Sequence, residues 1–255
     1  MKQIITGEQA ISWGVRLARA EVIAAYPMTS RSRAVPELSG WCARGELKAR
    51  FLQVESERSA VAACIGASSA GARTFAAASA QDLAGMHEGL HRAAGARLPI
   101  VMALAPDGTV STNRDDSLSQ RDTGWIQIHC EGNQELLDST IQAFKLAEVV
   151  DLPVMVVLDA FQLANTGEPV DIPEAAGVDA FLPARADRQG LDANELRAHG
   201  APAPPALHME MRLRQHLRRR SQRPFRTPEG VRDGAHLQRL GWVPLRRSAA
   251  QPAKA

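Results

Sequence analysis

The residues best placed to do chemistry are the carboxylates of residues 53–60. Glu57 follows the largely apolar segment 51–54 and precedes a run of small residues, 61–70, that favours a helix. A carboxylate at such a strand-to-helix turn lies where α/β sheets place their chemistry. Ser56, Glu57 and Ser59 also fit a helix N-cap followed by an acidic first turn. The local pattern therefore leaves two interpretations, a cap, which is the commoner use of such residues, and a functional carboxylate.

The histidines and cysteines give weaker evidence for a functional site. His87 and His91 stand four residues apart on a predicted helix, a spacing compatible with a metal, but no third ligand stands in a recognisable pattern. We therefore expect surface or interface histidines and no metal. The three cysteines, Cys42, Cys64 and Cys130, are odd in number and far apart, which argues against disulfides, zinc and iron–sulfur motifs. We expect them to pack as small hydrophobes in a reducing compartment.

These residues must be positioned by alternating strands and helices. Short apolar or alternating runs predict strands at 21–26, 51–54, 73–78, 98–104, 125–130 and 153–159, with a further strand at 159–166. Helical spacing predicts helices at 9–19, 34–42, 59–70, 83–94 and 135–150, with Thr6 and Asn133 as caps for the first and last. Residues 106–120 read as a long irregular loop.

This alternation predicts the fold class α/β, with a doubly wound, mostly parallel sheet and helices on both faces. Ligands in such sheets bind beyond the carboxyl ends of the strands. Loops at 27–32, 55–59, 79–82 and 106–120 should meet at that edge. Periodicity thus predicts a domain with a functional edge but no particular reaction.

Composition narrows the class of protein. The chain has 255 residues, 45% of them hydrophobic, and a formal net charge of only +2, so we expect a globular protein without nucleic acid as its main partner. The N-terminal residues lack a signal-peptide core, and no apolar run reaches the length of a membrane span. We expect a soluble, cytoplasmic protein. The domain should cover residues 1–183, and the Pro-, Ala- and Arg-rich segment 184–255 should be largely disordered.

Seven motifs occur in a fixed order along the chain. They are Ala24-Ala25-Tyr26-Pro27-Met28-Thr29, Val54-Glu55-Ser56-Glu57, Gly66-Ala67-Ser68-Ser69-Ala70-Gly71-Ala72-Arg73-Thr74, Arg97-Leu98-Pro99-Ile100-Val101, Arg121-Asp122-Thr123-Gly124-Trp125, Leu152-Pro153-Val154-Met155-Val156 and Glu168-Pro169-Val170. Together they closely resemble the first domain of the alpha subunit of 2-oxoacid:ferredoxin oxidoreductases, of which the pyruvate and aryl-glyoxylate enzymes are the nearest members. The resemblance covers about residues 3–183, and seven collinear motifs make it specific.

The resemblance implies a thiamine-diphosphate enzyme that decarboxylates a 2-oxoacid, passes the acyl group to coenzyme A and sends electrons through iron–sulfur clusters to ferredoxin. This chain would bind the pyrimidine end of the cofactor. A beta subunit would hold the diphosphate and its magnesium, and partner subunits would carry the clusters. The absence of a glycine-rich diphosphate loop and of a cysteine cluster agrees with that division.

The resemblance also assigns residues. Glu57 matches the glutamate that hydrogen-bonds the aminopyrimidine and favours its imino form, which takes the proton from the thiazolium C2. Tyr26 and Pro27 fall in the cofactor loop, and Thr29 matches a threonine that meets the substrate carboxylate. Family members usually carry an Asn-Arg-Ala step after the strand that ends near Leu104, and this chain lacks it. Arg114 is the candidate to replace that arginine as the carboxylate partner.

The C-terminal segment departs from the family, whose members continue into another α/β domain. We expect the resemblance to end at Gln215, beyond which basic residues dominate, and a frameshifted or degraded gene end is one explanation. An alternative to an active subunit is therefore a non-catalytic remnant or assembly subunit. A third hypothesis is polyanion binding through Arg218, Arg219 and Arg220.

Overall fold

The structure is a computed structural model that describes residues 1–26, 34–79, 83–105, 113–158 and 161–184, leaving out the side chains of residues 113–115, 161 and 162. The statements that follow concern these residues. Pro27, Thr29 and the whole of the segment 185–255, including the basic residues 218–220, lie outside them.

Six parallel strands form the central sheet in the order β3-β2-β4-β5-β7-β6. Their bounds are β2 Val22–Ala25, β3 Arg50–Gln53, β4 Thr74–Ser79, β5 Ile100–Ala105, β6 Ile126–Cys130 and β7 Val154–Leu158. Every pairing within this sheet is parallel. The doubly wound α/β class predicted from the alternation is confirmed. The first and last residues of each of the six predicted strands differ by at most two positions from those observed.

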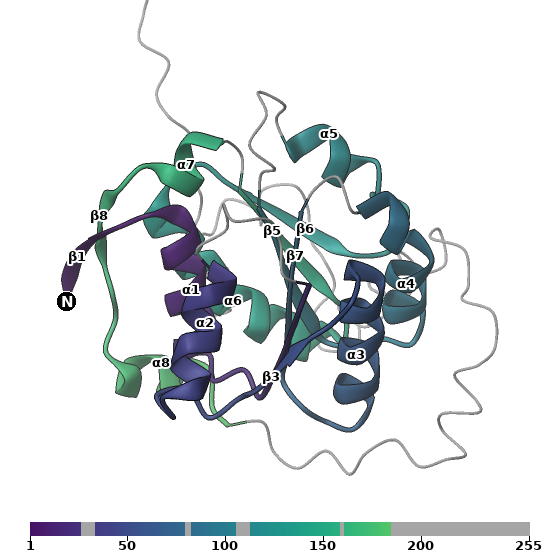
Figure 1. The fold of residues 1–255 in the computed structure, drawn as a ribbon, viewed down its shortest axis with the longest axis horizontal. Coiled ribbons are helices and arrows are strands. Elements are labelled where there is room, and N and C mark those ends of the chain that lie inside the picture. The colour runs from purple at the N-terminus through teal and green to yellow at the C-terminus, as the bar shows by residue number, and fades with distance from the viewer. Residues whose placement is uncertain (27–33, 80–82, 106–112, 159–160, 185–255) are drawn as a thin grey trace, which may run out of the picture. The chain divides into compact units, whose positions relative to one another are not determined.

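Helices cover both faces of this sheet (Figure 1). Helices α1 Gly7–Leu17, α2 Ala34–Ala43 and α6 Asn133–Val150 pack on one face, and α3 Glu57–Ser69 and α4 Leu83–Gly95 pack on the other. Strand β4 shows why both faces are apolar, since Phe75 and Ala77 join the first hydrophobic cluster while Ala76 and Ala78 join the second. A strand buried on both sides needs an unbroken apolar run, which is the pattern its sequence has.

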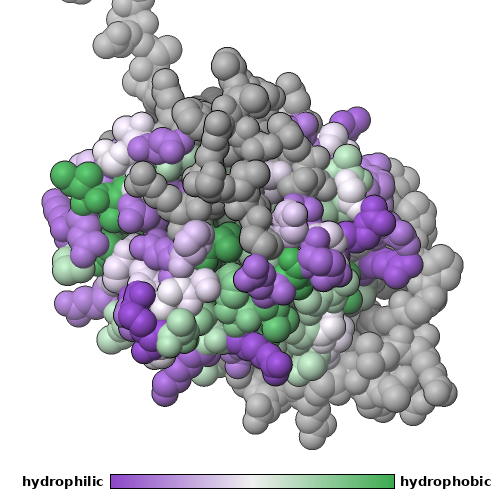
Figure 2. Space-filling model, viewed as in Figure 1, coloured by the Kyte–Doolittle hydropathy of each residue, from purple (hydrophilic) through white to green (hydrophobic). Residues whose placement is uncertain are grey.

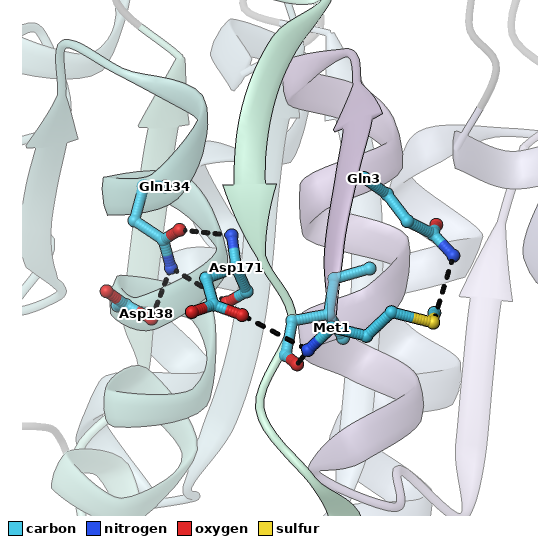
Figure 3. Close-up of polar contacts among 6 residues, drawn as sticks. Met1, Gln3, Gln134, Asp138 and Asp171 are labelled. Carbon is cyan, nitrogen blue, oxygen red and sulfur yellow. Dashed lines mark hydrogen bonds and ion pairs between the residues drawn. The ribbon is translucent and has the colours of Figure 1, made fainter.

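A second, two-stranded sheet pairs the N-terminal strand with a strand that precedes the last described helix. Strand β1 Lys2–Ile5 runs antiparallel to β8 Glu168–Asp171, and the Met1 amino group donates to the Ile172 carbonyl at 2.7 Å (Figure 3). The Gln134 side chain in α6 accepts a hydrogen bond from the Asp171 backbone N–H. This hydrogen bond connects the two-stranded sheet to α6. Figure 2 shows hydrophobic side chains at the β1 end, where Ile4 is 78% exposed.

Three expectations about local structure are wrong. Residues 161–165 form the short helix α7 Phe161–Asn165 rather than a strand. The predicted loop contains the helix α5 Asn113–Leu118. Helix α6 is capped by Gly132, and Asn133 instead donates from its buried amide to the Ile5 and Thr166 carbonyls.

The remaining helix is α8 Ala175–Phe181, which ends the described chain together with residues 182–184. The predicted cap at Thr6 is confirmed, and the structure shows that it is part of a capping box in which the Gln9 side chain accepts from the Thr6 N–H. None of the described helices combines the length and the hydropathy that crossing a bilayer requires.

Candidate functional site at the carboxyl edge of the sheet

The parallel sheet brings the carboxyl ends of all its strands to one edge. The chain leaves β2 toward β3 on one side and leaves β4 toward β5 on the other, so the strand order reverses direction between β2 and β4. Such a switch point is where open α/β sheets form a crevice for ligands. The loops that follow β2, β4 and β5 at this point lie largely outside the described residues.

Glu57 lies beside this switch point, at the first residue of α3. After β3 ends at Gln53, the Val54 N–H still donates to the Ala25 carbonyl at 3.2 Å, which keeps the turn against the end of β2. Helix α3 then packs on β2 and β4. Small residues such as Ala60 and Cys64, both fully buried, allow this close approach. The half-buried Glu57 side chain is therefore placed at the carboxyl edge and at the positive end of a helix dipole.

The structure shows which residue of this turn caps the helix. Ser56 has extended backbone angles, and its hydroxyl accepts from the Ser59 N–H at 3.2 Å, which is the N-cap hydrogen bond. Ser56 therefore makes the cap, and the cap hydrogen bond leaves the Glu57 carboxylate to other partners.

Glu55 occupies the same turn but has a local role. Its carboxylate accepts from the Ser59 hydroxyl at 2.6 Å, and this hydrogen bond, followed by one from the Glu55 backbone, lowers the pKa of Glu55 below its usual value. Glu55 is exposed, so an ionised carboxylate there is solvated as well as hydrogen-bonded. Two carboxylates two residues apart thus differ in environment, one exposed and one half-buried.

The other predicted site residues are placed only in part. Tyr26 follows β2 directly and is half-buried at the same edge as Glu57. The backbone of Arg114 lies in α5, while its side chain is outside the described part, as are Pro27 and Thr29 entirely. The structure therefore places Tyr26 and Glu57 at the same edge of the sheet, and the roles of all the predicted site residues stay predictions.

The cysteines are unsuited to nucleophilic chemistry. Burial raises the pKa of Cys64 to about 12, and burial also raises the pKa of Cys42. A thiol must ionise to react, so neither is an activated nucleophile at neutral pH. Cys64 and Cys130 are buried and Cys42 is partly exposed, and all three are free thiols. The expectation of small packed residues is confirmed for Cys64 and Cys130, whereas Cys42 is only partly buried.

One cluster was not found from the sequence. The structure brings Asp122 to the pair His87 and His91, so that one ligand atom from each of the three side chains lies within 4.8 Å of the others. Asp122 is 31 residues from His91 along the chain, and spacing alone does not reveal such a neighbour.

Comparison with known proteins identifies the family. Residues 14–224 match the family described as "Pyruvate flavodoxin/ferredoxin oxidoreductase, thiamine diP-bdg", so the match extends beyond Gln215 into the C-terminal segment. The chain is 48% identical over 220 residues to ketoisovalerate oxidoreductase subunit VorA of Pyrococcus abyssi, covering 84% of this chain and 56% of that relative. It is 47% identical over 218 residues to pyruvate synthase subunit PorA of Methanocaldococcus jannaschii, covering 82% of this chain and 56% of that relative.

Solved structures show the same fold. A 2-oxoglutarate:ferredoxin oxidoreductase from Magnetococcus marinus matches with a TM-score of 0.62 and 22% identity, over 69% of this chain and 32% of that one. A thiamine diphosphate-dependent 4-hydroxybenzoylformate decarboxylase from Rhodococcus jostii matches with a TM-score of 0.52 and 16% identity, over 68% and 33%. The chain spans little more than half the length of the curated relatives it matches.

Proposed function

Since the chain belongs to the pyruvate flavodoxin/ferredoxin oxidoreductase family, in its thiamine diphosphate-binding domain, we propose that it is the alpha subunit of a thiamine diphosphate-dependent 2-oxoacid oxidoreductase. The reaction is the oxidative decarboxylation of a 2-oxoacid to an acyl-CoA, with ferredoxin as the electron acceptor. Pyruvate and 2-ketoisovalerate are the first substrates to test, because the similar subunits PorA and VorA are named for pyruvate synthase and ketoisovalerate oxidoreductase. Aryl glyoxylates are the next class.

The observation that carries this proposal is the position of Glu57. A half-buried carboxylate at the first residue of α3, beside the end of β2, fits a ring nitrogen that must be protonated and hydrogen-bonded at the carboxyl edge. Thiamine diphosphate, when bound, supplies a nucleophilic carbon and accepts the electron pair left by decarboxylation. Glu57 would hold a proton between its carboxylate oxygen and the pyrimidine ring nitrogen, and, as the resemblance implies, Tyr26 and Pro27 would contact the cofactor.

Two further residues would bind the substrate. Thr29 would donate its hydroxyl to the substrate carboxylate, as the resemblance implies. Arg114 would supply the cation, because the usual arginine after β5 is missing from the run Leu104-Ala105-Pro106. A guanidinium that binds a carboxylate through two hydrogen bonds is the strong form of this contact.

The chain requires partner subunits for this reaction. It contains only three cysteines, two of them buried, whereas an iron–sulfur cluster needs four ligands. We propose that an iron–sulfur subunit carries the electrons and that a beta subunit holds the diphosphate and magnesium, so that the active site forms between subunits in the cytoplasm.

The alternative is a non-catalytic assembly subunit. The specific observation in its favour is the missing arginine step after β5, which removes a strong substrate anchor. Such a subunit would assemble with the beta subunit and bind the cofactor but would not turn over a 2-oxoacid.

Co-expression with a cognate beta subunit and iron–sulfur subunit tests both proposals. The assay is thiamine-dependent reduction of a low-potential dye in the presence of coenzyme A and a 2-oxoacid. Glu57→Gln should lower kcat by about 100-fold or more, the usual contribution of a positioned acid or base. Glu55→Gln is the matched control, since it removes an exposed carboxylate from the same turn and should change kcat by less than about threefold.

The activity of the Glu57→Gln complex and that of the wild-type complex test different parts of the proposal. Full activity of the Glu57→Gln complex would overturn the assigned role of Glu57. A wild-type complex that assembles and binds thiamine diphosphate, measured by calorimetry, but reduces no dye with any of the three substrate classes would favour the assembly subunit.

A further inference from the structure

Two histidines on α4 form a pair that the proposed reaction does not use. His87 and His91 lie one helical turn apart, and their ring centroids are 4.7 Å apart with an interplanar angle of 86°. Side chains four residues apart on a helix project from the same face. The pair therefore presents two imidazole rings to the same region of solvent.

Asp122 completes this group from a different part of the chain. It lies in the turn that precedes β6, and one oxygen of its carboxylate lies within 4.8 Å of a ring nitrogen of each histidine. Within the described ranges, the Asp122 carboxylate has no hydrogen bond or ion pair with another residue. The neighbouring Arg121 guanidinium donates to the Leu118 carbonyl. A carboxylate without a competing cation is available to bind one.

Gln120 fixes one of the imidazoles. Its side-chain oxygen lies 2.7 Å from His87 Nδ1, and its side-chain nitrogen donates to the Ser119 hydroxyl at 3.1 Å, which sets the amide orientation. Gln120 is only 4% exposed, and its backbone carbonyl accepts from the Thr123 hydroxyl, so the side chain is held in place. An acceptor at Nδ1 requires the proton there and leaves the lone pair on Nε2. Metal-binding histidines are oriented in this way by their second nitrogen.

We propose that His87, His91 and Asp122 bind a divalent transition-metal ion of the zinc type on the surface of this domain. Two imidazoles and one carboxylate match the ligands of zinc, whereas magnesium and calcium prefer oxygen throughout. With zinc–ligand bonds of about 2.1 Å, tetrahedral ligand atoms are about 3.4 Å apart, so the three atoms need to close by only an ångström or so. Because these side chains reach solvent, rotation about their side-chain bonds can bring the three ligand atoms to that distance. Water would complete the coordination of the ion.

This site is separate from the proposed magnesium site, which the beta subunit would hold. Its ligands come from α4 and from the turn between α5 and β6, so a bound ion would tie these two segments together. An ion that binds the folded state and not the unfolded state stabilises the folded state. This applies here because only the fold brings the three ligands together.

The test uses the full 255-residue chain and Zn²⁺ alone, titrated against a chromophoric chelator after the protein is stripped of metal. The wild type should bind one more zinc than His87→Gln and His91→Gln, and Asp122→Asn should bind it at least tenfold more weakly. Zinc should also raise the urea midpoint of the wild type and of the control Glu88→Gln, an exposed change on the same helix, but not that of the two histidine variants.

A second readout distinguishes the ligands from a general effect of the variants. Co²⁺ bound to the wild type should show visible absorption typical of low coordination number, and this absorption should be lost in His91→Gln. Equal zinc stoichiometry and affinity in the wild type and the histidine variants would overturn the proposal. Because His91 and Asp122 reach solvent, the metal-free His91→Gln and Asp122→Asn variants should keep the wild-type urea midpoint, which checks that they are folded.

Discussion

Removal of the Glu148 carboxylate should destabilise this domain strongly. Glu148, near the end of α6, accepts two hydrogen bonds from the Arg73 guanidinium, at 2.7 Å from Nε and 3.1 Å from Nη2. The side chain of Arg73 is only 3% exposed and that of Glu148 is 18% exposed. Arg73, which directly precedes β4, also donates to the carbonyl of Ala18, the C-cap of α1, and to that of Pro183, so one cation joins these segments to α6. Among the described residues, Glu148→Ala leaves this buried guanidinium with only the two backbone carbonyls as hydrogen-bond partners.

The expected loss of folding free energy follows from the burial of this ion pair. Breaking a buried ion pair by removing one partner typically costs about 3–5 kcal/mol, because the remaining charge is desolvated without compensation. With a urea dependence of about 2 kcal/mol per molar, this cost lowers the urea midpoint by about 1.5–2.5 M. Replacing both partners by apolar residues, as in Arg73→Met with Glu148→Leu, should restore most of the loss, since no buried charge then remains.

Urea denaturation of the full chain, followed by circular dichroism, measures these changes. The matched control is Glu88→Ala, which breaks the pair between Glu88 and Arg92 on the surface of α4, where the two side chains are 80% and 73% exposed. That change should cost no more than about 0.5 kcal/mol. A Glu148→Ala variant that loses less than about 1 kcal/mol would refute the reasoning, as would a double variant that is less stable than the single one.

The remaining predictions concern packing and pH. Gly14→Ala should destabilise the domain by about 1–3 kcal/mol, because the new Cβ would lie 2.7 Å from the Thr140 Cβ and Cγ2 where α1 crosses α6. In Gly66→Ala the new Cβ would have no described atom within 4 Å beyond its chain neighbours and its own helix backbone, so this change should instead stabilise the domain by about 0.4–1 kcal/mol, and equal urea midpoints for the two variants would contradict this. Burial raises the pKa of Asp138, an effect that a hydrogen bond from Gln134 partly opposes. The folded state thus binds this proton more tightly than the unfolded state, and stability falls as the pH rises from the ordinary aspartate pKa through the raised one. Asp138→Asn should therefore raise the urea midpoint at pH 7 and lose that advantage near pH 3; a constant difference at all pH values would contradict the sign.

Local patterns were sufficient to predict most of the fold. Apolar runs predicted the strands buried on both faces, such as β4, β5 and β7, since such a strand has to be apolar along its length, and alternation predicted the edge strand β6. The cap at Thr6 depends on residues only three apart, so it could also be predicted. The antiparallel ribbon of β1 and β8 could not, because it pairs Lys2 with Asp171 and neither strand is apolar enough to indicate its partner.

The sequence by itself determined that Glu57 stands at a strand-to-helix turn and, by resemblance, which family the chain belongs to. Only the tertiary structure decided that this turn is held against the end of β2 by the hydrogen bond from Val54 to Ala25. The same holds for Asp122, which lies within 4.8 Å of the histidine pair only because α4 and the turn before β6 fold together. The physical reason is one of range: propensity and periodicity report interactions within a few residues, whereas sites and buried charges depend on segments that meet through the packing of the whole sheet.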